Sequence, residues 1–390
     1  MPRGPGREAC GAEDGSSHII LVVFLSLLID LLGFTLILPL LPSILDHYSK
    51  SDDGLYSTVQ AGVDWFSRSL GIPPERKYNS VLFGGLISSL FSLLQFLASP
   101  LTGAASDSFG RRPALLATVL GLIASYSLWA ISRSFELFLC SRIIGGISRG
   151  NVSLSTAVIA DLQCPKARSK GMVPSVISGF KSAFNLISPW ALFQFSAIRQ
   201  KMGGPSRDSL KILGLVYFLY LFLFSGLEYS LSFLVHQHFH FSSLDQGKMF
   251  FFIGVTMAVI QGGYTRQIKP GEELKVVKRA IMLSAPGFLL TGWSNNVIIL
   301  GTGLLFYSFA AAVVVPCLST AVSSYGPDSQ KGTVMGILRS LGALARALGP
   351  VASATVYWLA GAKVCFTVCA SLFLLPFGLL QLMQKESKEE

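Results

Sequence analysis

Long runs of apolar residues alternate with short polar segments along almost the whole chain. Each run is about 20 residues long, the length that a helix needs to cross the hydrocarbon core of a bilayer. Charged clusters or glycine and proline residues separate the runs, as is typical of helix ends. The pattern predicts an all-α, multi-pass membrane protein. We place about ten spans, at Ile19–Leu45, Asn79–Thr102, Ala114–Ser132, Glu136–Leu162, Leu210–Val235, Leu244–Arg266, Val276–Trp293, Val297–Ser319, Gly332–Leu359 and Val364–Met383.

The stretch Met172–Phe195 has a different pattern from these runs. Its apolar and polar side chains recur on opposite sides of a helix: Val176, Phe180, Phe184, Ile187 and Ala191 against Ser178, Lys181, Ser182, Asn185 and Ser188. Such an amphipathic helix is suited to lie along the membrane surface rather than to cross it. We therefore expect residues 172–209 to form a cytoplasmic linker.

Composition and charge support a membrane protein with both termini in the cytoplasm. The chain is 51% hydrophobic and 13% charged, whereas soluble proteins carry about 25% charged residues. About 20 of the 31 lysine and arginine residues fall in the predicted cytoplasmic segments and about six in the outer loops, which is a positive-inside bias. The net charge of +10 is thereby explained without a nucleic-acid partner. The predicted divisions are an N-tail (1–18), an N-terminal half (19–171), the linker (172–209), a C-terminal half (210–383) and a C-tail (384–390).

Enzyme and metal chemistry find no support in the sequence. The six cysteines show neither paired nor metal-type spacing. A nucleophile elbow, a phosphate-binding loop and a metalloprotease helix are all missing from the sequence. We expect no enzymatic activity, no cofactor and no bound metal.

Three charged residues in the N-terminal half fall inside predicted spans. Asp30 lies midway along the first span, where a carboxylate costs about 2.5–3.5 kcal/mol and normally faces a partner or a wet cavity. A hydrogen bond between packed helices is the alternative. Arg142 and Arg149 lie seven residues apart and thus on nearly the same helix face. Arg142 is close to the outer end and could form a structural pair, whereas Arg149 is deeper and suits a carboxylate substrate.

The C-terminal half contributes a second set of charges. Glu228 is near Tyr217, Tyr220 and Tyr229 in the sequence, which suits a proton site, a cation contact or an ion pair. Arg339 and Arg346 repeat the seven-residue spacing among small residues. They could bind anions or pair with Asp30 or Glu228. The three alternating histidines His236, His238 and His240 are expected to line an outer loop.

Several motifs resemble those of the drug/proton antiporters of the major facilitator superfamily, of the tetracycline-efflux type. They are Asp30-x-x-Gly33 with Pro39-x-x-Pro42, the segment Gly103–Pro113, the run Arg142–Ile147 continuing to Ala160-Asp161, Gly332–Gly336, and Gly349-Pro350. The resemblance covers most of the chain outside the tails. It implies a helical fold in two halves, with substrate sites near the midplane at their interface.

The resemblance also implies a function and roles for the charged residues. The chain would export small organic anions, such as drug-like molecules, by alternating access, with protons as the candidate coupling ion. Asp30 and Glu228 would be proton or counter-charge sites, Arg149 and Arg346 anion contacts, and Arg142 and Arg339 would lie in the same pathway. The gating motif would be Gly103, Asp107, Gly110, Arg111 and Arg112. We expect a location in the plasma membrane, with an intracellular or nuclear-envelope membrane as the alternative.

The chain departs from the family in one respect. The family has two halves of six helices, whereas we find four spans before the linker and six after it. Helices 5 and 6, about 60 residues, are expected to be missing after Gly171. A second hypothesis is therefore a truncated protein that does not transport and is either inert or regulates the longer form.

Overall fold

The computed structural model describes residues 22, 25–26, 29–30, 32–33, 36–50, 54–69, 79–150, 154, 188–195, 204–269, 271–325 and 331–389. The regular elements within these residues are all helices, which confirms the predicted all-α class. Six of the helices are long and apolar enough to cross a membrane. The total of ten spans stays a prediction.

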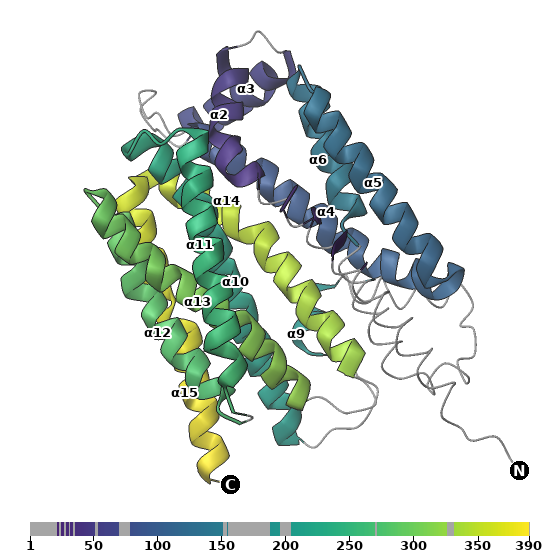
Figure 1. The fold of residues 1–390 in the computed structure, drawn as a ribbon, viewed down its shortest axis with the longest axis vertical. Coiled ribbons are helices and arrows are strands. Elements are labelled where there is room, and N and C mark those ends of the chain that lie inside the picture. The colour runs from purple at the N-terminus through teal and green to yellow at the C-terminus, as the bar shows by residue number, and fades with distance from the viewer. Residues whose placement is uncertain are drawn as a thin grey trace, which may run out of the picture.

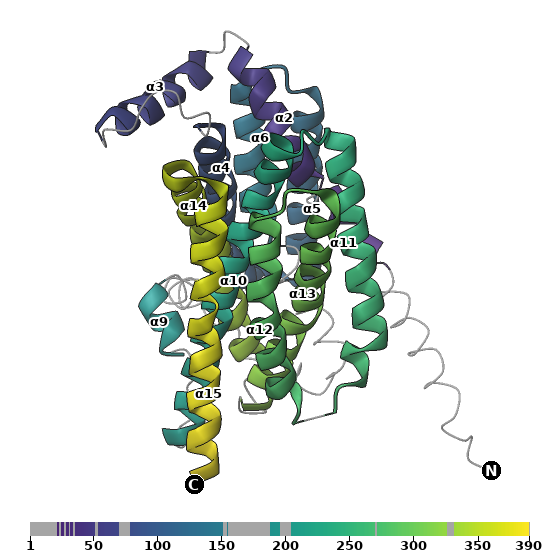
Figure 2. The same cartoon turned by 90° about the vertical axis from the view of Figure 1, so that its left-hand side faces the viewer.

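The helices form two bundles that lie side by side (Figure 1; Figure 2). The N-terminal bundle contains α2 (Ile37–Lys50), α3 (Gly54–Ser69), α4 (Asn79–Phe109), α5 (Arg111–Ile131) and α6 (Phe135–Ser148). The short α9 (Pro189–Phe193) follows. The C-terminal bundle contains α10 (Gly204–His238), α11 (Ser243–Gly263), η2 (Thr265–Gln267), α12 (Glu273–Gly292), α13 (Val297–Tyr325), α14 (Lys331–Leu372) and α15 (Leu374–Glu389).

The two bundles meet mainly where α4 crosses α14 (Figure 1). A Cβ atom on Gly85 would lie 2.6 Å from the Cβ of Ala354 and 3.1 Å from the carbonyl oxygen of Pro350. Only glycine therefore lets the two backbones approach this closely, as is common between membrane helices. Tyr229 of α10 adds a hydrogen bond of 2.6 Å to the carbonyl oxygen of Val81 in α4.

The end of α4 differs from the sequence-based expectation. Gly103–Pro113 falls between the predicted spans Asn79–Thr102 and Ala114–Ser132 and was therefore expected to be a loop, but α4 continues to Phe109 and α5 begins at Arg111. The alanine and serine residues of this segment tolerate a helix, so the end of the apolar run did not mark the end of the helix. Gly110 alone reverses the chain, with a φ of 100° that favours glycine.

The predicted gating contacts are not tested by this geometry. The side chains of Asp107 and Arg111 lie outside the described residues, as does the packing around Gly103, and the side chain of Arg112 is exposed. Residues 172–187 of the predicted surface helix also lie outside them. The helix α3, by contrast, has no counterpart among the elements predicted from the sequence.

The reversal between the last two predicted spans is present in the structure. It falls at Gly361, whose φ of 83° interrupts the helical backbone of α14. Because L side chains strain this conformation, glycine suits the turn. The chain then returns through the end of α14 and α15, which run beside α10 and α12.

Candidate functional site

Asp30 of the first span forms an ion pair with Arg149 at the end of α6. The Asp30 Oδ2 and Arg149 Nη2 atoms are 3.7 Å apart, and both residues are 7% exposed. Arg149 caps the C-terminus of α6, where the helix dipole favours a cation. Two buried charges thus compensate each other, as groups at membrane depth must. Sequence analysis offered Arg339 and Arg346 of the other half as ion-pair partners for Asp30, whereas the structure pairs it with Arg149 of its own half.

Tyr126 of α5 is a third member of this group, and sequence analysis did not identify it. Its hydroxyl donates a hydrogen bond of 3.1 Å to Asp30 Oδ1, the oxygen that lies away from the bonded guanidinium nitrogen. A Cβ atom on Gly33 would lie 3.0 Å from the Tyr126 Cζ atom. Gly33 therefore gives the tyrosine ring room beside the first span. The Asp30-x-x-Gly33 motif was the sequence signal for this contact, but it did not identify Tyr126 as the partner residue.

Arg142 lies in a different environment from Arg149. Its Cζ atom is 4.3 Å from the centroid of the Phe91 ring of α4, and the residue is 5% exposed. Arg149 reaches the same ring at 5.9 Å. Among the described residues, Arg142 has no carboxylate partner and no hydrogen bond. A cation–π contact does not neutralise a charge, so Arg142 keeps a free guanidinium charge.

Two glycines of α6 bring Arg142 onto the phenylalanine ring. A Cβ atom on Gly145 would lie 3.2 Å from Phe91 Cε2, and one on Gly146 would lie 2.9 Å from the Phe91 carbonyl oxygen. The consecutive glycines thus let α6 lie against α4. Because Arg142 lies one turn earlier on α6, its guanidinium group is placed over the ring.

Glu228 of α10 is bound by a tyrosine from another helix. The hydroxyl of Tyr307 in α13 donates a hydrogen bond of 3.0 Å to Glu228 Oε1. The Tyr307 ring stacks on Phe224 with centroids 4.8 Å apart. The tyrosines near Glu228 in the sequence do not provide this hydrogen bond, and Tyr229 instead reaches α4.

Arg346 of α14 lies within electrostatic range of Glu228 and of Arg149, the partner of Asp30. Its side chain is exposed, and its charge acts on Arg149 of the N-terminal bundle and on Glu228 of the C-terminal bundle. Arg339, two turns earlier, is half-buried and engaged in contacts. Within the described part of the chain, these four arginines face two carboxylates, Asp30 and Glu228. The region between the bundles therefore carries an excess of positive charge.

Two polar contacts join the bundles at the end of the molecule opposite the C-terminal end of α15 (Figure 1). Asp46 Oδ2 of α2 is 2.9 Å from His236 Nε2 of α10, and the hydroxyls of Ser43 and Ser243 are 2.8 Å apart. We call these two contacts the α2 strap. The expectation that the histidines line a loop is wrong for His236 and His238, because α10 continues to His238.

The comparisons with known proteins define the family. The Major Facilitator Superfamily model matches residues 23–192 and 199–350, so the chain belongs to this superfamily of membrane transporters and not to a class of enzymes. It is 54% identical to major facilitator superfamily domain-containing protein 10 of Mus musculus, over 100% of this chain and 98% of that protein. It is 22% identical to the class B tetracycline resistance protein of Escherichia coli, over 88% and 89% of the two chains.

A solved structure supports the same relationship. The crystal structure of the human organic anion transporter MFSD10 (TETRAN) superimposes with a TM-score of 0.78 at 54% sequence identity, covering 94% of this chain and 99% of that chain. The mouse alignment extends over 449 positions, whereas this chain has 390 residues. About 59 aligned positions, the difference between these lengths, thus have no residue in this chain.

Proposed function

We propose that this chain transports small organic anions by alternating access, with Arg142 as the main anion contact in the N-terminal half. The observation that carries the proposal is the buried Arg142 guanidinium, which lies on Phe91 without a carboxylate partner among the described residues. Burying an uncompensated charge is costly. An anionic substrate that enters from the space between the bundles supplies the missing countercharge.

The proposal assigns a different role to Arg149. Because Asp30 already faces Arg149, a substrate carboxylate competes with Asp30 for that guanidinium group. Protonation of Asp30 removes the competing negative charge and frees Arg149 for the substrate. This arrangement supports proton coupling through Asp30, with Glu228 as a second proton or counter-charge site and Arg346 as the anion contact of the other half.

Two further observations support an anion as the substrate. The region between the bundles has an excess of arginine over carboxylate groups, and the Phe91 ring under Arg142 suits an aromatic acid. The human relative of known structure is described as an organic anion transporter. We also propose that Asp107, Arg111 and Arg112 latch the cytoplasmic side, and that the plasma membrane is the site of action.

The test is counterflow of a radiolabelled aromatic carboxylate in proteoliposomes. A hydrogen bond to a charged group contributes about 1.5–3 kcal/mol. Arg142→Gln should therefore raise the substrate concentration at half-saturation about 10- to 150-fold. Arg142→Lys keeps the charge but loses the planar, forked guanidinium group. Its half-saturation concentration should lie between those of Arg142→Gln and the unaltered chain. The matched control is Arg133→Gln at the exposed outer turn. Equal half-saturation concentrations in Arg142→Gln and the unaltered chain would contradict the assignment of Arg142 as an anion contact.

A second function follows from the length difference. The shortfall of about 59 positions against the mouse relative supports the loss of helices 5 and 6 after Gly171, leaving four spans and six. Without them the N-terminal half lacks part of its wall, so the chain would act as a non-transporting or regulatory form. Counterflow by a chain with the mouse segment restored, and none by this chain, would support that alternative.

A further inference from the structure

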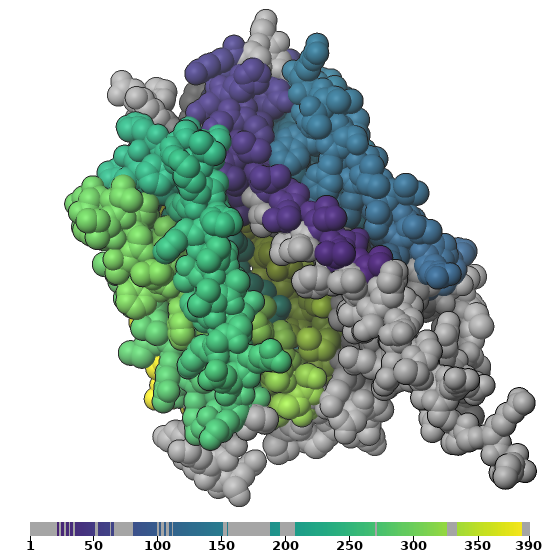
Figure 3. All heavy atoms as spheres, in the orientation of Figure 1, coloured from purple at the N-terminus to yellow at the C-terminus, as the bar shows by residue number. Residues whose placement is uncertain are grey.

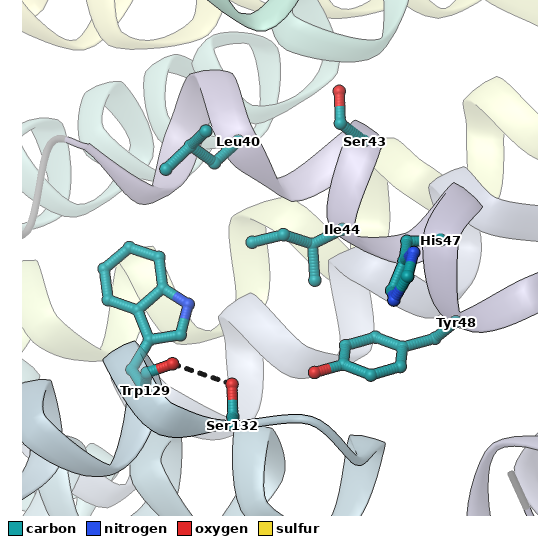
Figure 4. Close-up of a pocket in the computed structure, with 7 residues that line it drawn as sticks. All are labelled: Leu40, Ser43, Ile44, His47, Tyr48, Trp129 and Ser132. Carbon is teal, nitrogen blue, oxygen red and sulfur yellow. Dashed lines mark hydrogen bonds between the residues drawn. The ribbon is translucent and has the colours of Figure 1, made fainter. Parts of the chain in front are cut away.

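A pocket of about 310 Å³ lies between α2 and the outer end of α5. It is lined by Leu40, Ser43, Ile44, His47, Tyr48, Trp129 and Ser132 (Figure 4). Leu40 and Ile44 project from α2 toward the Trp129 ring, whereas Ser43 points away from the other lining side chains (Figure 4). The pocket thus separates the two helices at the level of the α5–α6 turn, where α5 ends at Ile131.

The pocket wall combines apolar side chains with hydrogen-bond donors. Among the described residues, the indole N–H of Trp129 has no hydrogen-bond partner, and its nitrogen is on the side of the ring that faces α2 (Figure 4). The Ser132 hydroxyl donates a hydrogen bond of 2.7 Å to the Trp129 carbonyl oxygen. His47 is exposed and stacks edge-on against Tyr48, with ring centroids 5.6 Å apart. A ligand with acceptor oxygens would satisfy the indole and imidazole nitrogens.

An exposed apolar stripe on the first span leads to this pocket. Five large side chains on one helix face are each 46–69% exposed: Val22, Leu25, Ile29, Leu32 and Leu36. They follow one another at steps of three or four residues, and the next step reaches Leu40 in the pocket wall. At 1.5 Å per residue the stripe is about 21 Å long, more than the ~15 Å of one hydrocarbon leaflet. In Figure 3 the first span is visible as a purple band at the surface beside α5.

We propose that this stripe and pocket bind one phospholipid molecule of the outer leaflet, with its phosphate group at Trp129 and His47 and an acyl chain along the stripe. Tryptophan and tyrosine near helix ends are typical of the headgroup level of a membrane. An apolar ligand would leave both donors unpaired, and a small soluble anion would leave the stripe uncovered. A phospholipid would pair both donors with its phosphate oxygens and would cover the stripe with an acyl chain.

Bound lipid would act on the contact between the two bundles. Ser43 lines the pocket and also contacts Ser243 of α11, and Asp46 follows three residues later on α2. A lipid that fills the gap between α2 and α5 supports α2 in the position from which the α2 strap reaches the C-terminal bundle. This inference does not depend on the substrate that the chain transports.

The test is photolabelling of the full chain in phosphatidylcholine nanodiscs that contain a phosphatidylcholine with a diazirine on one acyl chain. Mass spectrometry of the peptides should place the label on the first span and on α5. Ile44→Trp fills the pocket, and should reduce this label about tenfold while labelling of other spans stays constant. Trp129→Phe removes one donor, and should weaken labelling about fivefold, the effect of one hydrogen bond.

The matched control is Trp293→Phe. Trp293 is another tryptophan near a helix end, and it is exposed. Unlike the half-buried Trp129, its indole nitrogen already donates a hydrogen bond of 3.0 Å to Thr367. Its replacement should leave the label on the first span unchanged. A melting curve verifies that each variant is folded, and Leu40→Phe serves as a milder filling variant where Ile44→Trp fails to fold.

Two results would overturn the proposal. Equal labelling of all lipid-facing spans, unchanged in both filling variants, would show an ordinary lipid annulus and no site. Loss of the label on addition of free palmitate, with no change when the unlabelled share of the phosphatidylcholine is raised, would assign the pocket to a fatty acid instead. A label that falls as the unlabelled share rises, and that is about fivefold weaker in Trp129→Phe, would support the phospholipid.

Discussion

The α2 strap predicts how strongly the two bundles stay in contact at the end where α2 lies, an arrangement that we call the closed state. Asp46 and His236 keep 50% and 27% of their side chains exposed, so their contact is screened and contributes about 0.5–1 kcal/mol. The Ser43–Ser243 hydrogen bond adds about 0.5–1 kcal/mol. Together they favour the closed state by about 1–2 kcal/mol, or roughly 5- to 30-fold in population. Combining Asp46→Asn with Ser43→Ala should remove most of this bias.

The assay is a distance measurement between spin labels on the two bundles. Labels at Ser49→Cys on α2 and Leu244→Cys on α11 occupy exposed positions, in a background in which Cys10, Cys140 and Cys164 are replaced by serine. The strap variant should enlarge the population with the longer distance by the fold-change given above, whether or not the chain transports.

Two further variants make the interpretation of that distance measurement specific. Exchanging the partners, Asp46→His with His236→Asp, restores the pair and should restore the shorter distance. Asp245→Asn is the matched control, because Asp245 pairs with Lys248 on its own helix at 3.2 Å. The reasoning is refuted where the strap variant and the control give the same distance distribution, or where the exchanged pair behaves like the single Asp46→Asn change.

Three stability predictions concern helix packing and can be checked by melting curves in detergent. Gly85→Leu should lower the melting temperature most, because overpacking against Ala354 costs about 1–3 kcal/mol or more; an unchanged melt would contradict the α4–α14 contact. Gly361→Ala should cost about 1 kcal/mol through its φ of 83°, with Gly336→Ala in a helical, open position as control. Tyr307→Phe removes the hydrogen bond to Glu228 and should cost about 1–3 kcal/mol, since a buried acceptor is left unsatisfied.

The fold class and many helix positions could be predicted because hydrophobic runs are local signals. The predicted span Val297–Ser319 begins where α13 begins, and Leu210–Val235 lies within α10. Helix ends were harder to predict. The apolar run marks the part of a helix that meets hydrocarbon, whereas hydrogen bonding continues into polar turns, as in α4 up to Phe109.

The site was predicted as a set of charges but not as a set of pairs. Asp30, Arg149 and Glu228 stood out because ionisable residues are costly in a membrane span. Their partners Tyr126 and Tyr307 are 96 and 79 residues away in the chain. Tyrosines are common in such spans, so the sequence contained no signal that distinguished these two. The difference between Arg142 and Arg149 likewise depends on how α6 packs against α4 and the first span.

Anion binding and transport, both proposed for this chain, can be tested separately. The arginines that would hold an anion are on α6 and α14, both of which the chain retains, whereas the proposed deletion removes helices between α6 and α9. The loss of helices 5 and 6 would leave the pathway open to leakage across the membrane, but it would not remove the arginines that line the pathway. A chain that binds an aromatic carboxylate but shows no counterflow would therefore support the regulatory form and keep Arg142 as the anion contact. Absence of binding in a folded chain would contradict that assignment, whichever of the two functions is correct.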